Sequence, residues 1–253
     1  MTLTLPWVAL ESVLLAGVRM AMFFVISPPF AHRAIPGTVK ALLAMGLALV
    51  VAPRARAASD PTDVAAFAGQ VLVQVLIGAA LGFLVALVFS ALQSAGGLID
   101  LFAGFQLSQA YDPLNLVNGA QFARLYQFTA IVLLFASDGY QVVIAGLVRT
   151  FDVLPLGTPL NLAAMAAVST RGLTQMFLAA LQIAGPLVVV LFLADVGLGL
   201  LTRVAPALNA FALGFPLKIL LTLLLAGTAY VALPQLVSSL TGDAVTNLSE
   251  VTP

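Results

Sequence analysis

The stretch 64–105 reads VAAFAGQVLVQVLIGAALGFLVALVFSALQSAGGLIDLFAGF and is the longest apolar region of the chain. As one helix it would be about 60 Å long at ~1.5 Å per residue, roughly twice the ~30 Å thickness of the hydrocarbon core of a membrane. We therefore expect it to turn back on itself. Gly96 and Gly97 are the expected place, because paired glycines weaken a helix and accept positive φ. The limb that follows, ending near Phe105, is too short to cross again.

One face of this stretch carries small or polar side chains among Leu, Val, Ile and Phe. Steps of four residues from Gln70 meet, in order, Gln74, Gly78, Gly82, Ala86, Ser90 and Ser94. Gly78 and Gly82 have the spacing that lets two helices approach closely. The stripe winds about 240° around a helix, so one flat partner cannot cover it. We expect several surrounding helices or a bend; the alternative is a run produced by an Ala- and Gly-rich composition.

The composition of the whole chain predicts an integral membrane protein. Of 253 residues, 62% are hydrophobic and 8% are charged, against roughly 25% charged in an ordinary soluble domain. Apolar regions recur at about 7–26, 39–51, 64–105, 122–136 with an extension to 148, 173–201 and 204–240. We expect a single all-α membrane domain over 1–253, built from kinked helical hairpins. Irregular backbone at membrane depth needs protein or a water-filled cavity around it, so we expect neighbouring chains.

Few residues suit an enzyme, a metal site or a cofactor. The chain has no cysteine, and its one histidine, His32, lies in SPPFAHRAIPG, which its prolines mark as a loop. The pair Tyr111 and Asp112 would suit an intramembrane aspartyl protease, but the Gly-X-Gly-Asp partner is missing and Pro113 indicates a turn. The sequence has no basic run for nucleic acid. We expect no catalytic residue, no metal and no cofactor.

Four charges lie within apolar regions and need an explanation. Glu11 and Arg19 are eight positions apart, which separates them by about 80° around a helix and excludes a pair. Asp195 and Arg203 have the same spacing across the glycine-rich VGLGLL, where a chain that folds back would bring them together. The two open alternatives are that all four lie near helix ends and reach water, or that they have buried partners.

The last apolar region contains RVAPALNAFALGFPLKI at 203–219. We expect Pro206, Pro216 and Pro234 to divide it, because an internal proline removes a helical hydrogen bond and clashes with the preceding turn. Asn209 can bond backbone groups that the prolines release. Arg203 and Lys218 would meet partner chains or water. A broken helix of this kind would also suit the binding site of a secondary solute transporter.

Several motifs together resemble the FliR family of flagellar biosynthetic proteins, which is related to the T subunits of virulence injectisomes. They are GLGLLTRVAPALNAFALGFPLKI at 197–219, Arg19, SPPF at 27–30, Pro36, Lys40, Pro53, IGAALGF at 77–83, SAGGLIDLFAGF at 94–105, YDP at 111–113 and FDVLPLG at 151–157. The likeness extends from about Arg19 to Pro234. Ala207 departs from it, since the family commonly has Pro-Gln-Leu-Asn where this chain has PALN, which puts a polar role there in doubt.

The resemblance implies a non-enzymatic structural and gating subunit of the flagellar type III protein export channel, in the bacterial inner membrane at the flagellar basal body. One such chain would join FliP-like and FliQ-like subunits in a helical gate, with a FlhB-like protein at the entrance, and unfolded flagellar subunits would pass. Its fold would resemble a FliP and a FliQ fused. The competing interpretations are a secondary solute transporter and, more distantly, an intramembrane enzyme.

The resemblance also implies roles for particular residues. The loop 106–120 would be the pore plug, with Gln106, Leu107, Ser108, Tyr111, Asp112, Pro113 and Asn115 as its plug residues. Structural or partner-packing roles fall to Arg19, Gly78, Gly82, Asp100, Asp195, Arg203, Pro206, Asn209, Pro216 and Lys218. The loop has a single charge, at Asp112, so it can move without burying ions. The alternative is an ordinary surface loop.

Overall fold

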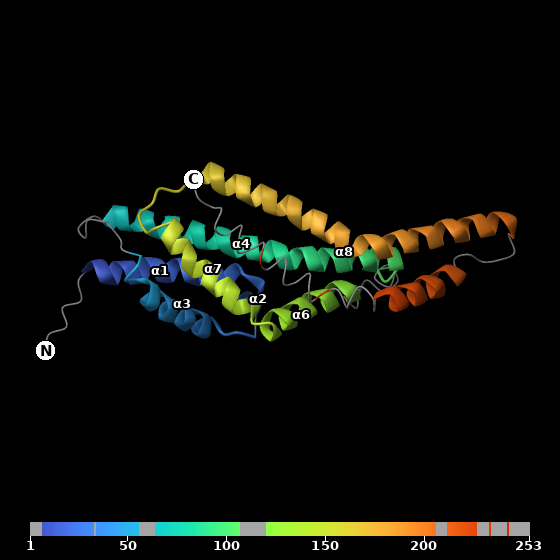
Figure 1. Cartoon of the computed structure of the whole chain (residues 1–253), viewed down its shortest axis with the longest axis horizontal. Helices are drawn as coiled ribbons and strands as arrows, with labels where there is room; N and C mark the ends of the chain where they lie inside the picture. Colours follow the sequence, from blue (N-terminus) through green and yellow to red (C-terminus); the bar gives the residue numbers. More distant parts are fainter. Residues whose placement is uncertain are drawn as a thin grey trace. The chain divides into compact units, whose positions relative to one another are not determined.

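The computed structural model describes residues 7–32, 34–55, 64–106, 120–205 and 212–226, together with positions 233 and 242. The helices are α1 (Trp7–Ile26), α2 (Pro28–Ala31), α3 (Gly37–Val51), α4 (Val64–Ala103), α6 (Gln121–Ala136), α7 (Gly139–Val153) and α8 (Leu162–Val204), followed by a further helix, Ala212–Ala226. Within these ranges there is no strand (Figure 1). The all-α prediction is confirmed.

The lengths of the helices fit a membrane protein. In the described part of the chain, α1, α4 and α8 are long and apolar enough to cross a bilayer. The pair α6 and α7 would make a fourth span, but it is bent by 78°. The apolar region at 122–136 and its extension to 148 thus form two separate helices, because Asp138 adopts φ 57°, in the left-handed region, and interrupts the helical hydrogen bonds between them. As expected, α3 is too short to span.

The predicted turn at Gly96 and Gly97 is wrong. Helix α4 runs for 40 residues without interruption and ends only at Ala103, followed by Gly104 at φ 85°. The glycine pair lowers helix propensity by only about 1 kcal/mol per residue, less than the helix gains from its packing. Gly96 serves a different purpose, since it lets another helix approach closely, as described below.

The described chain divides into two compact units. Unit 1 comprises residues 1–88, 137–173 and 239–253, and so contains α1, α2, α3, α7 and the first parts of α4 and α8. Helix α3 lies against α1 (Figure 1). The rings of Phe23, Phe24 and Phe30 form a cluster, with centroids 5.0 Å apart for Phe24 and Phe30. The prolines of SPPF begin α2 rather than a loop, because proline suits the first turn of a helix.

Unit 2 comprises residues 89–136 and 174–238, and so contains α6, the later parts of α4 and α8, and Ala212–Ala226. Helix α8 continues through VGLGLL to Val204, so the expected bend there is wrong. It ends two residues before Pro206, as a proline favours. Pro186 and Pro216, in contrast, lie inside helices, so Pro216 does not divide the last region as predicted. Neighbouring helices can satisfy the carbonyl that such a proline releases.

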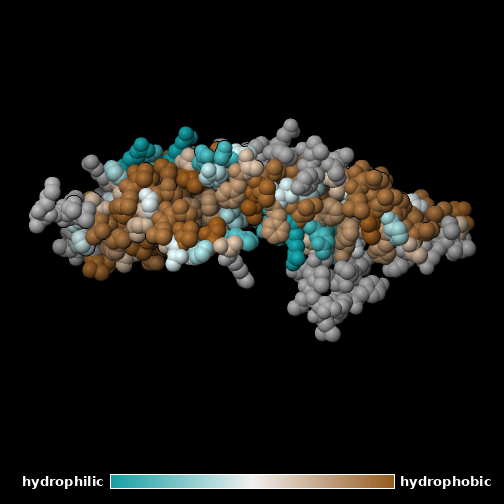
Figure 2. Space-filling model, turned by 90° about the horizontal axis from the view of Figure 1, so that it is seen from below, coloured by the Kyte–Doolittle hydropathy of each residue, from teal (hydrophilic) through white to brown (hydrophobic). Residues whose placement is uncertain are grey.

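Much of the apolar surface is not covered by the chain itself. The face drawn in Figure 2 is mostly hydrophobic. In the most apolar 18-residue part of α1, 50% is buried inside the structure, whereas in the corresponding part of α8 only 22% is buried. Phe177, Leu181 and Phe192 of α8 are all more than half exposed. Such a surface needs lipid or other protein around it.

Candidate functional site

Arg19 is fully buried in unit 1 and has several partners there. Its Nε donates to Oε1 of Gln74 at 2.7 Å, and its Nη2 donates to the carbonyl oxygen of Leu154 at 2.9 Å. A longer bond, 3.4 Å, joins Nη1 to the carbonyl oxygen of Thr150, and the guanidinium lies 4.1 Å from the centroid of the Phe151 ring. Of the two explanations for intramembrane charge, Arg19 therefore follows that of buried partners.

The position of Arg19 has an electrostatic reason. Helix α7 ends at Val153, and the carbonyls of Thr150 and Leu154 lie at this end. The last carbonyls of a helix carry its negative dipole end, which favours a cation. The carbonyl of Thr150 also accepts a hydrogen bond from the N–H of Leu154 at 2.8 Å. Sequence reasoning missed Thr150 and Phe151 as partners of Arg19. Two sequence features could have pointed to partners of Arg19: the FDVLPLG motif at the end of α7, and the place of Gln74 in the stripe of small and polar residues.

Gly78 and Gly82 bring α4 against α1. A Cβ on Gly78 would collide with the backbone carbonyl of Arg19, and one on Gly82 would lie 3.0 Å from Cβ of Ile26 and 3.1 Å from the carbonyl oxygen of Phe23. The two helices thus touch backbone to backbone at these positions. This is the close approach that the spacing of the two glycines predicts. The whole stripe lies on one uninterrupted helix, so it does not pass through a hairpin turn.

Asp100 is fully buried in unit 2 and holds the first turn of α6. Its Oδ1 accepts a hydrogen bond from the backbone N–H of Phe122 at 2.9 Å, and its Oδ2 accepts one from Ala123 at 3.0 Å. These amides lie in the first turn of a helix, where they have no intrahelical acceptor. The carboxylate therefore acts as the N-cap of α6 from 22 residues earlier in the chain.

Asp195 pairs with Lys218 and not with Arg203. The Lys218 Nζ lies 2.5 Å from Oδ1 of Asp195, and the side chain of Lys218 is 16% exposed against 46% for Asp195. Because α8 stays helical between them, Asp195 and Arg203 remain about two turns apart, so the expected fold-back pair is wrong. Arg203 is exposed near the end of α8.

Part of the predicted set lies outside the described residues. These positions are Leu107, Ser108, Tyr111, Asp112, Pro113 and Asn115 of the expected plug, and Pro206 and Asn209 of the last region. Gln106, the first plug residue, is described and lies just after the end of α4. The structure thus shows both ends of the predicted plug loop but describes nothing of its middle.

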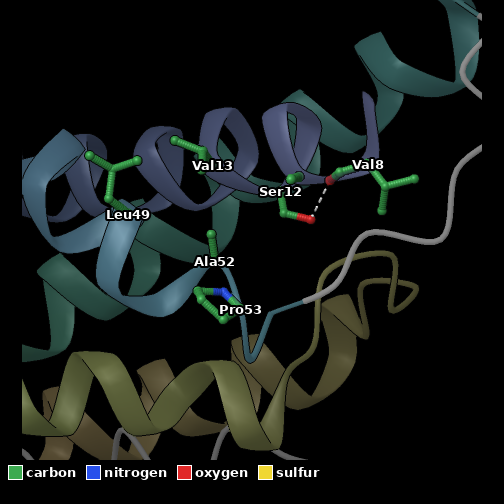
Figure 3. A pocket seen from close by; sticks show the side chains of 7 residues that line it. Val8, Ser12, Val13, Leu49, Ala52 and Pro53 are labelled. Atoms are coloured by element: carbon green, nitrogen blue, oxygen red, sulfur yellow. Dashed lines mark hydrogen bonds between the residues drawn. The ribbon is translucent and has the colours of Figure 1, made fainter. Parts of the chain in front are cut away.

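One cavity lies within the part of the chain that the structure describes, and its lining is mainly apolar. This cavity of about 550 Å³ lies between α1 and α3, lined by Val8, Ala9, Ser12, Val13, Leu49, Ala52 and Pro53. Among these described lining residues only Ser12 has a polar side chain, and its hydroxyl donates to the carbonyl of Val8 in its own helix at 2.7 Å (Figure 3). A solute site normally has several convergent polar groups. Among the described residues, no three acids or histidines gather as metal ligands.

The chain was compared with known protein families. The family described as "Bacterial export proteins, family 1" matches residues 10–244. The chain belongs to this family. The matched residues run from the first turn of α1 past the end of Ala212–Ala226, and they include Arg19, Asp100 and the Asp195–Lys218 pair.

Flagellar and surface-presentation proteins from several bacteria are similar to the chain. The flagellar biosynthetic protein FliR of Escherichia coli (strain K12) is 36% identical over 203 residues, which cover 79% of this chain and 77% of that protein. FliR of Pectobacterium carotovorum is 30% identical over 235 residues, which cover 92% of this chain and 90% of that protein. The surface presentation of antigens protein SpaR of Salmonella typhimurium is 32% identical over 214 residues, which cover 82% of this chain and 78% of that protein.

These relatives confirm the resemblance found in the motifs. The family and its FliR members make this chain a subunit of a flagellar type III export apparatus, embedded in a membrane. The solute-transporter interpretation is not favoured. The family is described as one of bacterial export proteins, and its FliR relatives are described as flagellar biosynthetic proteins.

Proposed function

We propose that this chain is a non-enzymatic structural and gating subunit of the flagellar export channel, and that its loop 106–120 is the pore plug. The observation that carries the gating role is the construction of the loop's base, where buried Asp100 of α4 binds the first turn of α6. A loop whose two ends are fixed can occupy a pore without the helices around it moving. Energy for export would come from other components.

We further propose that the chain works within a hetero-oligomer. One copy would join FliP-like and FliQ-like subunits, with a FlhB-like protein at the entrance, in the bacterial inner membrane at the flagellar basal body. The exposed apolar surface of α8 supports such neighbours. So does the length of α4, because 40 residues make a helix about 60 Å long, which a bilayer of ~30 Å cannot cover. Unfolded flagellar subunits would be the cargo.

Within that assembly the polar residues would hold the architecture. Arg19, Gly78, Gly82 and Asp100 would fix the chain's own helices, as their contacts suggest. The Asp195–Lys218 pair would join α8 to Ala212–Ala226. Arg203, Pro206, Asn209 and Pro216 would shape the surface that meets partners. We keep the proposal of one domain over 1–253, since α4 and α8 each contribute to both compact units.

Deletion of residues 106–120 tests the plug. We expect the assembled gate without this loop to leak small ions, measured as membrane conductance in cells that lack export substrates. A matched control replaces the loop with a Gly/Ser linker of the same length, which preserves the connection between α4 and α6 and removes the plug residues. It should leak as well. A tight gate in both variants, with normal assembly, would reject the plug.

Co-expression with FliP-like and FliQ-like proteins tests the assembly. We expect purification of this chain to recover the unlike partners, and the native mass of the complex to require one copy of it. A symmetric oligomer of this chain alone, stable without partners, would instead support a transporter.

A further inference from the structure

Asp100 contacts both helix ends that border the loop 106–120. Its backbone carbonyl accepts a hydrogen bond from the N–H of Phe105 at 3.0 Å, and the carbonyl of Leu101 accepts one from Gly104 at 3.3 Å. With Gly104 at φ 85°, this is the Schellman pattern that ends a helix. The same residue uses its carboxylate to bind the N–H groups of Phe122 and Ala123.

The two ends also meet through side chains and backbone. The rings of Phe105 and Phe122 have centroids 5.6 Å apart. A Cβ on Gly96, one turn before Asp100, would lie 2.5 Å from the carbonyl oxygen of Phe122 and 2.6 Å from Cα of Ala123. Only glycine lets the start of α6 come this near to α4. We call the contacts of Asp100 with Phe105, Phe122 and Ala123 the loop neck.

We propose that Asp100 is the positioning residue of the loop neck, and that its carboxylate and carbonyl together fix where the segment between α4 and α6 leaves and re-enters the helices. The carboxylate is well suited to this. Both of its oxygens are occupied by N–H groups at the positive end of α6, which favours an anion in a buried place. The local glycine cap alone would end α4 but would leave the start of α6 free to move away.

A cysteine pair at the loop neck measures how closely the end of α4 and the start of α6 are held together. The chain has no cysteine of its own, so only the introduced pair can react. In the assembled gate carrying Phe105→Cys and Phe122→Cys, we expect oxidation or a short thiol crosslinker to join the two positions rapidly. Adding Asp100→Asn, which keeps the shape but replaces one acceptor oxygen with a donor and removes the charge, should slow cross-linking. The expected factor is about 5 to 30, the population change that follows loss of a helix cap.

Asp152→Asn is the matched control, since Asp152 is exposed on α7 and the chemical change is the same. It should leave the cross-linking rate unchanged. Equal rates in D100N and the parent would overturn the proposal. Failure of D100N to accumulate in membranes where D152N accumulates would also overturn it, because it would show a general folding role.

Ion leak provides a second measurement, and only this one rests on the proposed plug. We expect D100N to leak and the cross-linked neck to restore a tight gate in the D100N background. If deletion of 106–120 leaves the gate tight while D100N still slows cross-linking, the plug is wrong and the neck stands. If the deletion leaks but D100N changes neither cross-linking nor leak, the neck is wrong.

Discussion

The Arg19 side chain of α1 donates to the Gln74 side chain of α4 across 55 positions of sequence, with 2.7 Å between Nε and Oε1. The same guanidinium reaches the end of α7 at Leu154. One buried cation thereby joins three helices of unit 1. No acid binds it among the described contacts, so its charge is balanced by carbonyl dipoles and the face of an aromatic ring.

Replacing Arg19 with Ala should destabilise unit 1 by roughly 2 to 5 kcal/mol, because at least two buried acceptors lose their donor at about 1 to 3 kcal/mol each. The thermal midpoint in detergent would fall by roughly 2 to 4 °C for each kcal/mol. Arg19→Lys should recover only part of the loss, since an ammonium cannot span the same acceptors. Arg149→Ala, at an exposed position of α7, is the control and should change little. Equal midpoints for R19A and R149A would contradict this account.

Gly78→Ala should force α1 and α4 apart, because the added Cβ meets the backbone carbonyl of Arg19, which cannot rotate away. Overpacking of this kind costs about 1 to 3 kcal/mol. Gly69→Ala on the same helix has no atom within 4 Å of its new Cβ and should stabilise by up to about 1 kcal/mol through helix propensity. Thermal unfolding of both variants in detergent compares them. A neutral G78A would show that the helices are not held this closely.

Gly96 and Gly97 are adjacent, yet we expect opposite effects from alanine. At Gly96 the new Cβ would press on the backbone of Phe122 and Ala123, whereas at Gly97 it would find no atom within 4 Å. G96A should lose about 1 to 3 kcal/mol, and G97A should be neutral or more stable. The yield of assembled gate and the thermal midpoint measure this. A larger loss of stability in G97A than in G96A would contradict this account and would favour a turn at the glycine pair.

Charge exchange tests the ion pair of Asp195 and Lys218. Asp195→Lys and Lys218→Asp each place like charges together and should lower the thermal midpoint and the recovery of the assembled complex. The double variant restores opposite charges and should recover more than half of the loss, with a coupling energy of about 1 kcal/mol because Asp195 is 46% exposed. Additive losses in the double variant would mean that the two residues act separately.

The sequence predicted some features of the fold because they depend on local chemistry. Apolar length predicted membrane helices, and the four-residue spacing of Gly78 and Gly82 predicted a close helix contact. The predictions that proved wrong concerned where helices end. Gly96 and Gly97, VGLGLL and Pro216 all weaken a helix locally, but α4, α8 and Ala212–Ala226 each stay continuous through them. A glycine lowers helix stability by only about 1 kcal/mol, and a long helix that has already formed tolerates such a residue.

By itself, the sequence determined the membrane class and, through its motifs, the export family. It marked Arg19 and Asp195 as unusual, because a charge in an apolar segment is costly whatever its partner. The resemblance to the export family added Asp100 and Lys218. Only the tertiary structure decided those partners. Arg19 meets Gln74 and Leu154, and Asp100 meets Phe122, across separations from 22 to 135 positions that no local rule spans. Such contacts depend on which helices pack together, and that is a property of the folded chain.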